Sequence, residues 1–181
     1  CRRWPRSSAG AVRGSPPCGS FFLRANIWPS AQERIYRASD PASFSYELPH
    51  DHNFDFLTLG YFGPGCLSDY WEADYEALHG WRGEDAALRF AGRECLTPGR
   101  ILHYRAHRDV HRQLPPESLS VSLNVMHADP GQGWLDQYRY DTGRGVIAGI
   151  LNEGASEAFL RLAVGLGGGE ALDLADSFAR S

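Results

Sequence analysis

Short apolar runs, broken by glycine, proline and small polar residues, recur along residues 21–126. Residues 120–125 (SVSLNV) alternate strictly between polar and apolar, which is the period of a strand with one buried face. Several such segments separated by turn residues are typical of an antiparallel β-sandwich or barrel. We expect strands at FFLRANIW (21–28), ERIYRA (33–38), FSYEL (44–48), HNFDFLTL (52–59), YWEADYEAL (70–78), ALRFAGREC (87–95), RILHYRA (100–106) and SLSVSLNVM (118–126).

The two ends of the chain carry different patterns. Residues 1–20 are rich in Arg, Ser, Gly and Pro without periodicity, which is typical of a disordered leader. Residues 155–167 and 168–180 carry Leu and Phe at helical spacing on either side of a glycine run, which predicts a helical hairpin. We therefore divide the chain into the leader, a β-rich domain over 21–130, and a C-terminal helical extension over 131–181 that packs on the β domain.

Composition and charge narrow the class of protein. The 181 residues are 43% hydrophobic, and no apolar run approaches the roughly 18 residues of a membrane span. The net charge of −4 argues against nucleic acid as a partner. The four cysteines have no CxxC spacing, so we expect reduced thiols in a soluble, cytoplasmic protein rather than disulfides or a structural zinc.

Two histidines stand one residue apart at the start of an apolar run, in PHDHNFDFLTLG (49–60). In a strand, residues two apart point to the same face, so His50 and His52 would present two imidazoles to one space. The usual reason for such a pair is a metal ion, and a metal needs at least one further protein ligand.

A third ligand has three candidates, His103, His107 and His111. Their spacing would place all three on one face of a helix. Proline and glycine flank this segment, however, so we expect a strand, a turn around residues 106–109 and a second strand from near Val110. A strand at His111 would hold its side chain more firmly than the polar turn holds that of His107. His103 is expected either to contact the metal ligands without binding the metal or to be structural, and His79 and His127 to lie on the surface.

The order of these motifs resembles the cupin superfamily, and within it the thiol dioxygenases such as cysteine dioxygenase. HDH at 50–52 precedes FLTLG at 56–60, and a histidine precedes the VSLN strand at 121–124, as in that family. The resemblance covers roughly residues 44–126. It implies a jelly-roll barrel, the double-stranded β-helix of cupins, and His50, His52 and His111 as metal ligands, with His107 as the main alternative to His111.

The resemblance further implies an oxygenase. Three neutral imidazoles suit Fe(II), although other divalent metals accept the same ligands. The expected partners are dioxygen and a small anionic substrate, such as a thiol or an amino acid derivative. Around the metal we expect Tyr104 and His107 to be catalytic, and Arg105, Tyr61 and Asp55 to bind the substrate.

Three other functions compete with this interpretation. One is a non-catalytic cupin that binds a metal or senses a ligand. Another is a 2-oxoglutarate-dependent oxygenase, but those enzymes carry HxD or HxE, and His52 occupies the position of the acid. Zinc-dependent hydrolysis is disfavoured because no positioned carboxylate base is evident. The general cupin motif also has a Glu shortly after the second histidine, where this chain has Phe56 and Leu57.

Overall fold

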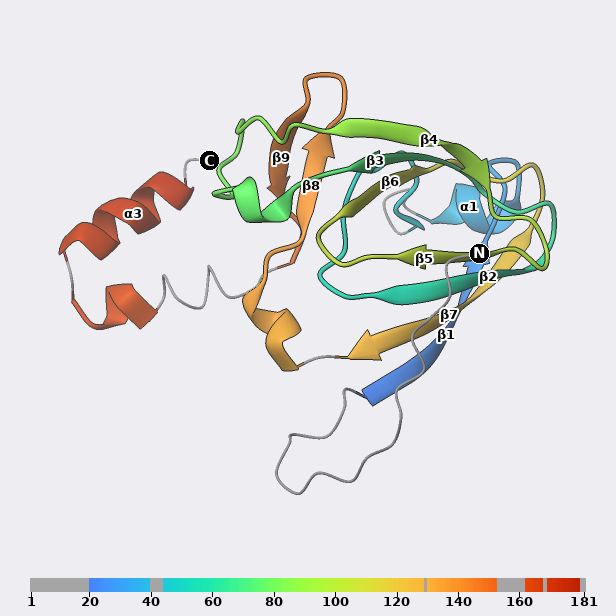
Figure 1. The fold of residues 1–181 in the computed structure, drawn as a ribbon, viewed down its shortest axis with the longest axis horizontal. Coiled ribbons are helices and arrows are strands. Elements are labelled where there is room, and N and C mark those ends of the chain that lie inside the picture. Colours follow the sequence, from blue (N-terminus) through green and yellow to red (C-terminus); the bar gives the residue numbers. More distant parts are fainter. Residues whose placement is uncertain (1–19, 40–43, 129, 153–161, 168, 180–181) are drawn as a thin grey trace.

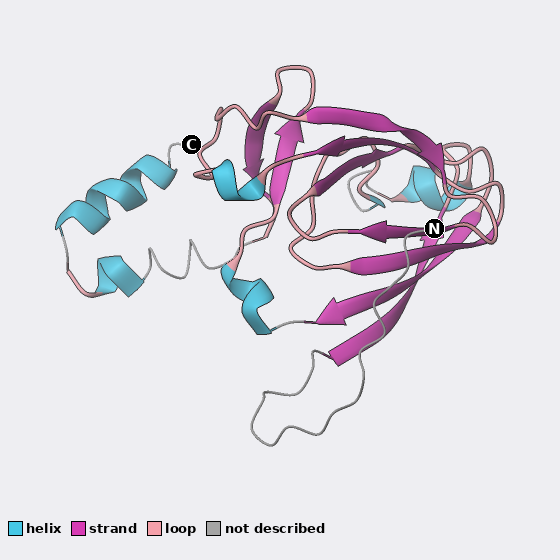
Figure 2. Ribbon diagram, viewed as in Figure 1, coloured by secondary structure: helices cyan, strands magenta, loops and turns pink. Residues whose placement is uncertain are grey.

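The computed structural model of the chain describes residues 20–39, 44–128, 130–152, 162–167 and 169–179. Strands are the main regular elements of these residues, and they are all antiparallel to their neighbours (Figures 1 and 2). The strands are β1 (Ser20–Trp28), β2 (Phe56–Phe62), β3 (Leu67–Glu72), β4 (Arg89–Cys95), β5 (Ile101–Tyr104), β6 (Asp109–Gln113), β7 (Ser120–Ala128), β8 (Tyr138–Asp141) and β9 (Val146–Ile150).

The strands form three sheets. A four-stranded sheet has the order β1-β7-β2-β5, a three-stranded sheet has the order β4-β3-β6, and β8 and β9 form a hairpin. The mainly β, antiparallel architecture expected from the sequence is confirmed. Among the described residues, no strand pairing closes the sheets into a continuous barrel.

The four-stranded sheet has its polar face inside. Along β7 the polar residues Ser120, Ser122 and Asn124 are buried, whereas Leu123 and Val125 are exposed. The predicted alternation is therefore present, but the buried face is the polar one. Thr58 on β2 belongs to the same inner face, where its hydroxyl donates a hydrogen bond to the Asn124 side-chain oxygen at 2.7 Å.

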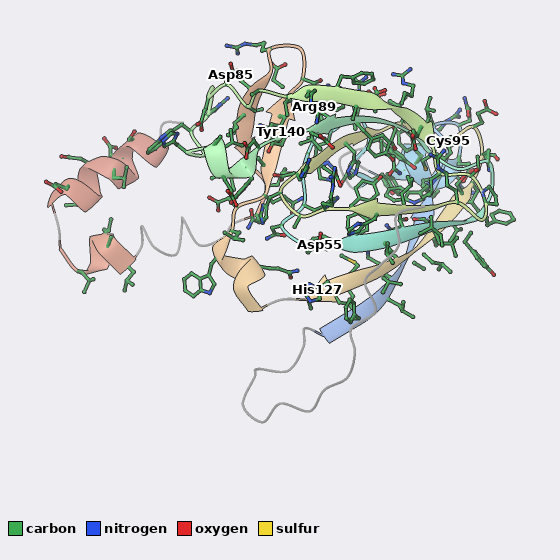
Figure 3. All side chains as sticks on the ribbon, in the orientation of Figure 1. Asp55, Asp85, Arg89, Cys95, His127 and Tyr140 are labelled. Atoms are coloured by element: carbon green, nitrogen blue, oxygen red, sulfur yellow. The ribbon has the colours of Figure 1, made fainter. Side chains whose placement is uncertain are left out.

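Apolar packing concentrates where the β8–β9 hairpin meets β6. Val110, Tyr138, Tyr140 and Ile147 are almost completely buried there, together with small side chains from neighbouring loops. Figure 3 shows the position of Tyr140 on the ribbon. The sequence pattern did not predict this hairpin. Its strands are only 4 and 5 residues long, too short to show a clear alternation.

Two segments expected as strands have other conformations. Residues 33–38 contain the short helix α1 (Arg34–Ala38), and residues 44–47 form a turn that is 3₁₀ at Phe44. Both are short, and aromatic side chains from the two stack against one another, with the Tyr36 and Phe44 rings 5.7 Å apart. Tertiary packing has overridden a weak local strand preference here.

The other strand predictions are confirmed with shifted ends. The strand after HDH begins at Phe56 rather than at residue 52, and the segment 70–78 ends its strand at Glu72 before a 3₁₀ turn over 75–77. The turn at 106–108 and the strand that follows it lie where they were expected. Of the cysteines, Cys66 and Cys95 are free thiols, and Cys1 and Cys18 lie outside the described residues.

The C-terminal extension includes helix α3 (Gly169–Ala179), which stands apart from the sheets in Figure 1. Every described side chain of α3 is exposed, so the expected packing of this helix on the β domain is not seen in these residues. Residues 153–161, which include the start of the predicted hairpin, lie outside the description, as do residues 1–19 of the predicted leader; Ser20 already belongs to β1. No described helix is both long and apolar enough to cross a membrane.

A buried carboxylate ties the three-stranded sheet together. Asp69 on β3 accepts hydrogen bonds from Arg93 on β4, at 2.9 Å, and from Arg112 on β6, at 2.6 Å. The side chain of Arg93, and then that of Arg112, lowers the pKa of Asp69 from 3.8 to about 2.

We predict that Asp69→Asn lowers the free energy of unfolding by about 2 kcal/mol at neutral pH, because it removes hydrogen bonds between charged groups. The folded pKa lies below the unfolded value of 3.8, so this stabilisation is present above pH 3.8 and is lost as the pH falls towards 2. Urea denaturation across this range should show the two proteins converging at low pH. Asp173→Asn on α3 is the control, and a difference between Asp69→Asn and wild type that is independent of pH would contradict the prediction.

Candidate metal centre

The HDH segment is extended and lies between β6 and β8. His50 and His111 are joined by two backbone hydrogen bonds, from the His50 N–H to the His111 oxygen at 3.0 Å and in the reverse direction at 2.9 Å. On the other side, the Asp51 N–H donates to the Tyr138 oxygen at 3.2 Å. The chain is thus held from both sides, and successive side chains alternate between two spaces.

Three imidazoles meet on one of those sides. The ring centroids lie 4.9 Å apart for His50 and His52, 4.5 Å for His50 and His111, and 5.2 Å for His52 and His111. One nitrogen from each ring can be chosen so that all three lie within 4.8 Å of one another, and all three residues are buried. This is a cluster that could hold a metal ion.

Burial keeps these rings neutral. It lowers the pKa of all three histidines, and for His111 the neighbouring His50 and His52 lower the pKa further. For His52, His50 and then Arg24 add to the effect of burial. The neutral imidazole is the form that binds metals, so the environment favours the ligand state.

The hydrogen-bonding state of the rings fits a metal. His50 Nδ1 lies 2.8 Å from the Leu48 carbonyl oxygen, so its N–H donates there and Nε2 keeps its lone pair. The Nδ1 atoms of His52 and His111 are buried without a hydrogen-bond partner among the described residues. Buried nitrogens of this kind are costly, and coordination of the ring to a metal offsets part of that cost.

Asp51 points to the opposite side and anchors the segment. It is completely buried, and its carboxylate accepts hydrogen bonds from the Tyr138 N–H at 2.6 Å and the Tyr140 hydroxyl at 3.1 Å. The Gln137 side chain donates to the Asp51 carbonyl oxygen at 2.7 Å. Burial raises the pKa of Asp51 to about 7, while the two donors to its carboxylate oppose that rise.

Aromatic side chains form one wall beside the histidines. The rings of Phe54 and Phe56 lie 5.0 and 4.9 Å from that of His52, and Tyr104 stacks on Phe56 at 4.5 Å. The Tyr104 ring is 4.9 Å from His111, and its hydroxyl hydrogen-bonds that of Tyr70 at 2.8 Å. Tyr104 is therefore positioned beside the cluster by packing and by one buried polar partner.

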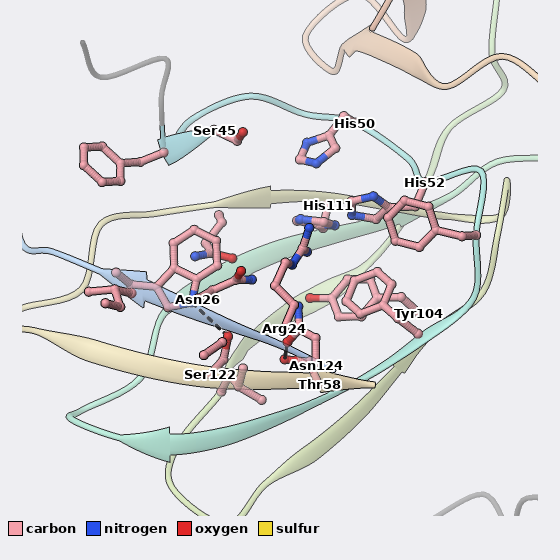
Figure 4. Close-up of a pocket in the computed structure, with 18 of the residues that line it drawn as sticks. Arg24, Asn26, Ser45, His50, His52, Thr58, Tyr104, His111, Ser122 and Asn124 are labelled. Atoms are coloured by element: carbon pink, nitrogen blue, oxygen red, sulfur yellow. Dashed lines mark hydrogen bonds between the residues drawn. The ribbon is translucent and has the colours of Figure 1, made fainter. Parts of the chain in front are cut away.

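The three histidines line a cavity of about 660 Å³ whose floor is the inner face of the four-stranded sheet (Figure 4). Asn26, Ser122, Asn124 and Thr58 supply polar groups to this floor. Arg24 rises from β1 toward His111 (Figure 4) and has no ion-pair partner among the described residues. No Asp or Glu is among the described residues that line the cavity.

The structure separates His107 from the other histidines. His107 lies in the turn before β6 with a φ of 58°, and its N–H donates to the His52 oxygen at 2.7 Å. Its ring packs on Tyr75, 4.0 Å away, and lines a second cavity rather than the one that the three histidines line. His107 is therefore outside the group of His50, His52 and His111 that could hold a metal.

The three residues expected to bind substrate do not line the cavity. Arg105 is paired with Glu72 and Asp109, and Asp55 accepts a hydrogen bond from the Ala106 N–H at 3.0 Å. Tyr61 is exposed at the irregular end of β2. The side chains of Arg105 and Asp55 are thus engaged by other groups of the protein, and that of Tyr61 faces solvent.

Of the remaining histidines, His103 is exposed beside Asp55, with 3.7 Å between His103 Nε2 and the carboxylate, and it does not line the cavity. His79 is exposed and pairs with Glu84 at 3.1 Å, as expected for a surface residue. His127 is partly buried at the end of β7, where its ring lies 5.2 Å from Phe21.

Arg24 is the site residue that the sequence analysis missed. A signal for it was present, because Arg24 and Asn26 interrupt the apolar strand FFLRANIW two residues apart, on one face. Gln137, which contacts both the cavity and the HDH backbone, gave no such signal because it lies in a loop.

Comparisons with known proteins do not add a family to this description: no protein-family model and no curated protein matches the chain. The structure shows a mainly antiparallel β protein with a buried cluster of three histidines that could hold a metal.

We predict that His50→Ala, His52→Ala and His111→Ala each bind far less metal than wild type, because each removes one of the three clustered ligands. His107→Ala is the matched control and should retain its metal, since its ring lies in the other cavity. Metal content after gel filtration, with circular dichroism to check the fold, measures both. A metal-free His107→Ala protein alongside a fully loaded His111→Ala protein would contradict this assignment.

We predict that Asp51→Ala lowers the free energy of unfolding by about 3 kcal/mol, because it leaves two buried donors without an acceptor at about 1–3 kcal/mol each. Metal affinity should fall by about tenfold or more, as for other residues that orient ligands. Asp51→Asn keeps an acceptor for the Tyr138 N–H, so its effects should be smaller. Urea unfolding and a chelator titration measure the two quantities, and equal damage by both variants would show that the hydrogen bonds do not matter.

Proposed function

We propose that this chain is a mononuclear non-haem iron oxygenase, of dioxygenase type, that acts on a small anionic substrate such as a thiol or an amino acid derivative. The observation that carries the proposal is the composition of the cavity wall. Three buried neutral histidines share that wall with one unpaired arginine and, among the described lining residues, with no carboxylate.

The arrangement of the sheets supports a cupin-like jelly roll for this proposal. The four-stranded sheet and β6 of the three-stranded sheet line opposite parts of one cavity, with the HDH segment at its rim. A metal site inside such a cavity, with ligands from HxH and from a distant strand, is what the resemblance to the thiol dioxygenases implies. Two facing antiparallel sheets are also the elements from which a jelly roll is built.

The ligand set favours iron over the alternatives. A ferrous ion held by His50, His52 and His111 would supply the one-electron chemistry that couples dioxygen to an organic substrate. The same three ligands accept zinc, but hydrolysis would need a carboxylate base, and none is among the described lining residues. A 2-oxoglutarate oxygenase would need an acid in place of His52. Asp51 cannot serve, because its carboxylate points to the other side.

Arg24 defines the charge of the substrate. A guanidinium without a counter-ion, in a cavity with no described acid, is a site for a carboxylate or another anion. Arg24 would bind this group and thereby fix the end of the substrate that lies away from the metal. Tyr104 would donate its hydroxyl hydrogen bond near the reacting end, and Phe54 and Phe56 would limit the access of water.

The test is metal analysis of protein purified without added metal, combined with oxygen uptake against a panel of thiols and amino acids. Bound iron near one ion per chain, with uptake that depends on an anionic substrate, is the expected result. The chain would be a binding or sensing protein if iron is bound and no substrate of the panel consumes oxygen. Protein that binds no divalent metal while keeping its fold would refute the proposal.

We predict that Arg24→Gln raises the KM for an anionic substrate by about tenfold or more, because one hydrogen bond between charged groups is lost. Its metal content should stay at the wild-type level, since Arg24 is not a ligand. Arg34→Gln, an exposed arginine on α1, is the control. Steady-state oxygen uptake gives KM, and an unchanged KM in Arg24→Gln would exclude this residue from substrate binding.

A further inference from the structure

The four-stranded sheet presents an apolar face on the side away from the cavity. The strand register places opposite residues on the same face, as with Leu23, Val125 and Leu57, which lie side by side across β1, β7 and β2. We call this surface the outer face. Its apolar residues are Phe21, Leu23, Ala25 and Ile27 on β1, Val121, Leu123 and Val125 on β7, Leu57, Leu59 and Phe62 on β2, and Ile101 on β5.

These side chains are open to solvent at the margins and partly open between them. Leu23 is 80% and Ile27 59% exposed on β1, and Ile101 is 62% exposed on β5, whereas Leu123 and Val125 on β7 are 37% and 38% exposed. Single exposed leucines are common, but a continuous apolar surface across four strands marks an interaction site. The inner face of the same strands already carries the cavity, so the outer face is a separate surface.

The charge of the outer face points to a second copy of this chain as its occupant. In a two-fold interface the same patch lies on both partners, so each group on it must tolerate its own counterpart nearby. The register places no Asp, Glu or Arg among the outer-face residues of these strands. The titratable side chains are confined to one end, where His103 and His127 lie and where Asp55, just before β2, is 3.7 Å from His103. The rest of the face can pack against a second copy of itself without like charges meeting.

The size of the face agrees with a dimer. Strands lie about 4.8 Å apart and rise about 3.3 Å per residue, so four strands over roughly seven residues span a flat area of about 400 Å². Protruding side chains enlarge the accessible area, and two such faces together approach the roughly 1,000 Å² of a biological interface. Two sheets packed face to face at about 10 Å would form a sandwich across the two-fold axis.

We propose that the outer face of the four-stranded sheet is the interface of a homodimer with two-fold symmetry. The metal cavities of the two copies then open on the far sides of the paired sheets, so dimerisation leaves both accessible. This proposal is independent of the metal and of the proposed activity.

Sedimentation velocity of the full chain over a wide range of concentration tests the proposal. Wild type should sediment as a dimer, and Leu23→Glu should raise the dimer dissociation constant by about tenfold or more, because it places a carboxylate in an apolar interface. Ile101→Glu, at the opposite margin of the face, should weaken the dimer in the same direction. Both positions are exposed in the single chain, so circular dichroism should be unchanged.

Ile35→Glu is the matched control, since Ile35 is an exposed aliphatic residue on α1, outside the outer face. Its dissociation constant should equal that of wild type. A wild-type monomer at every concentration would overturn the proposal, whatever else covers the face. So would a dimer that Ile35→Glu weakens as much as Leu23→Glu does, or an open-ended assembly whose mass grows with concentration.

Discussion

The pair of backbone hydrogen bonds between His50 and His111 is the constraint on which the site depends. It joins two residues that are 61 positions apart in the chain, and it sets their side chains next to each other. With Asp51 fixed on the other side by Tyr138 and Tyr140, the HDH segment cannot rotate. Successive side chains of an extended chain point to opposite sides. His50 and His52 therefore face the cavity because Asp51 faces the core.

The main apolar core of the described residues lies outside the cavity, and this leaves the cavity open. A sheet with its polar face inward gains little from covering that face, so the described apolar core lies mainly between the β8–β9 hairpin and β6, with a smaller aromatic cluster around Phe56, Tyr104 and Met126. The carboxylate of Asp51 sits in the first cluster and His52 contacts the second. Both apolar clusters therefore stabilise the position of the histidines, while the polar sheet remains free to contact a ligand.

The sequence predicted the site better than it predicted the fold around it. The spacing of His50 and His52 was sufficient to place both rings on one side, although the segment is not part of a regular strand. The choice of His111 over His107 rested on expecting a turn followed by a strand, which is what forms. Arg105 and Asp55 lie outside the cavity for a physical reason: Arg105 pairs with Glu72 and Asp109, and Asp55 accepts a hydrogen bond from the Ala106 N–H. Pairings of this kind form only in the folded chain, so the sequence alone does not reveal them. The turn over 44–47 and the β8–β9 hairpin depend on tertiary contacts that short segments do not reveal.

The electrostatics of the cavity decide what it can attract. The chain as a whole carries a net charge of −4, yet Arg24 is the only charged side chain among the described lining residues, and the three histidines stay neutral. A divalent ion held by neutral ligands would keep its full charge and would lie near a guanidinium that has no counter-ion. Such a cavity is strongly positive inside an acidic protein, and low-dielectric walls such as Phe54 and Phe56 focus that potential. With a divalent ion in place, the arrangement would favour small anions over further cations. Burial keeps the three imidazoles neutral, and the absence of acids from the described wall leaves Arg24 without a counter-ion, so the two together would set the charge of any ligand that the cavity accepts.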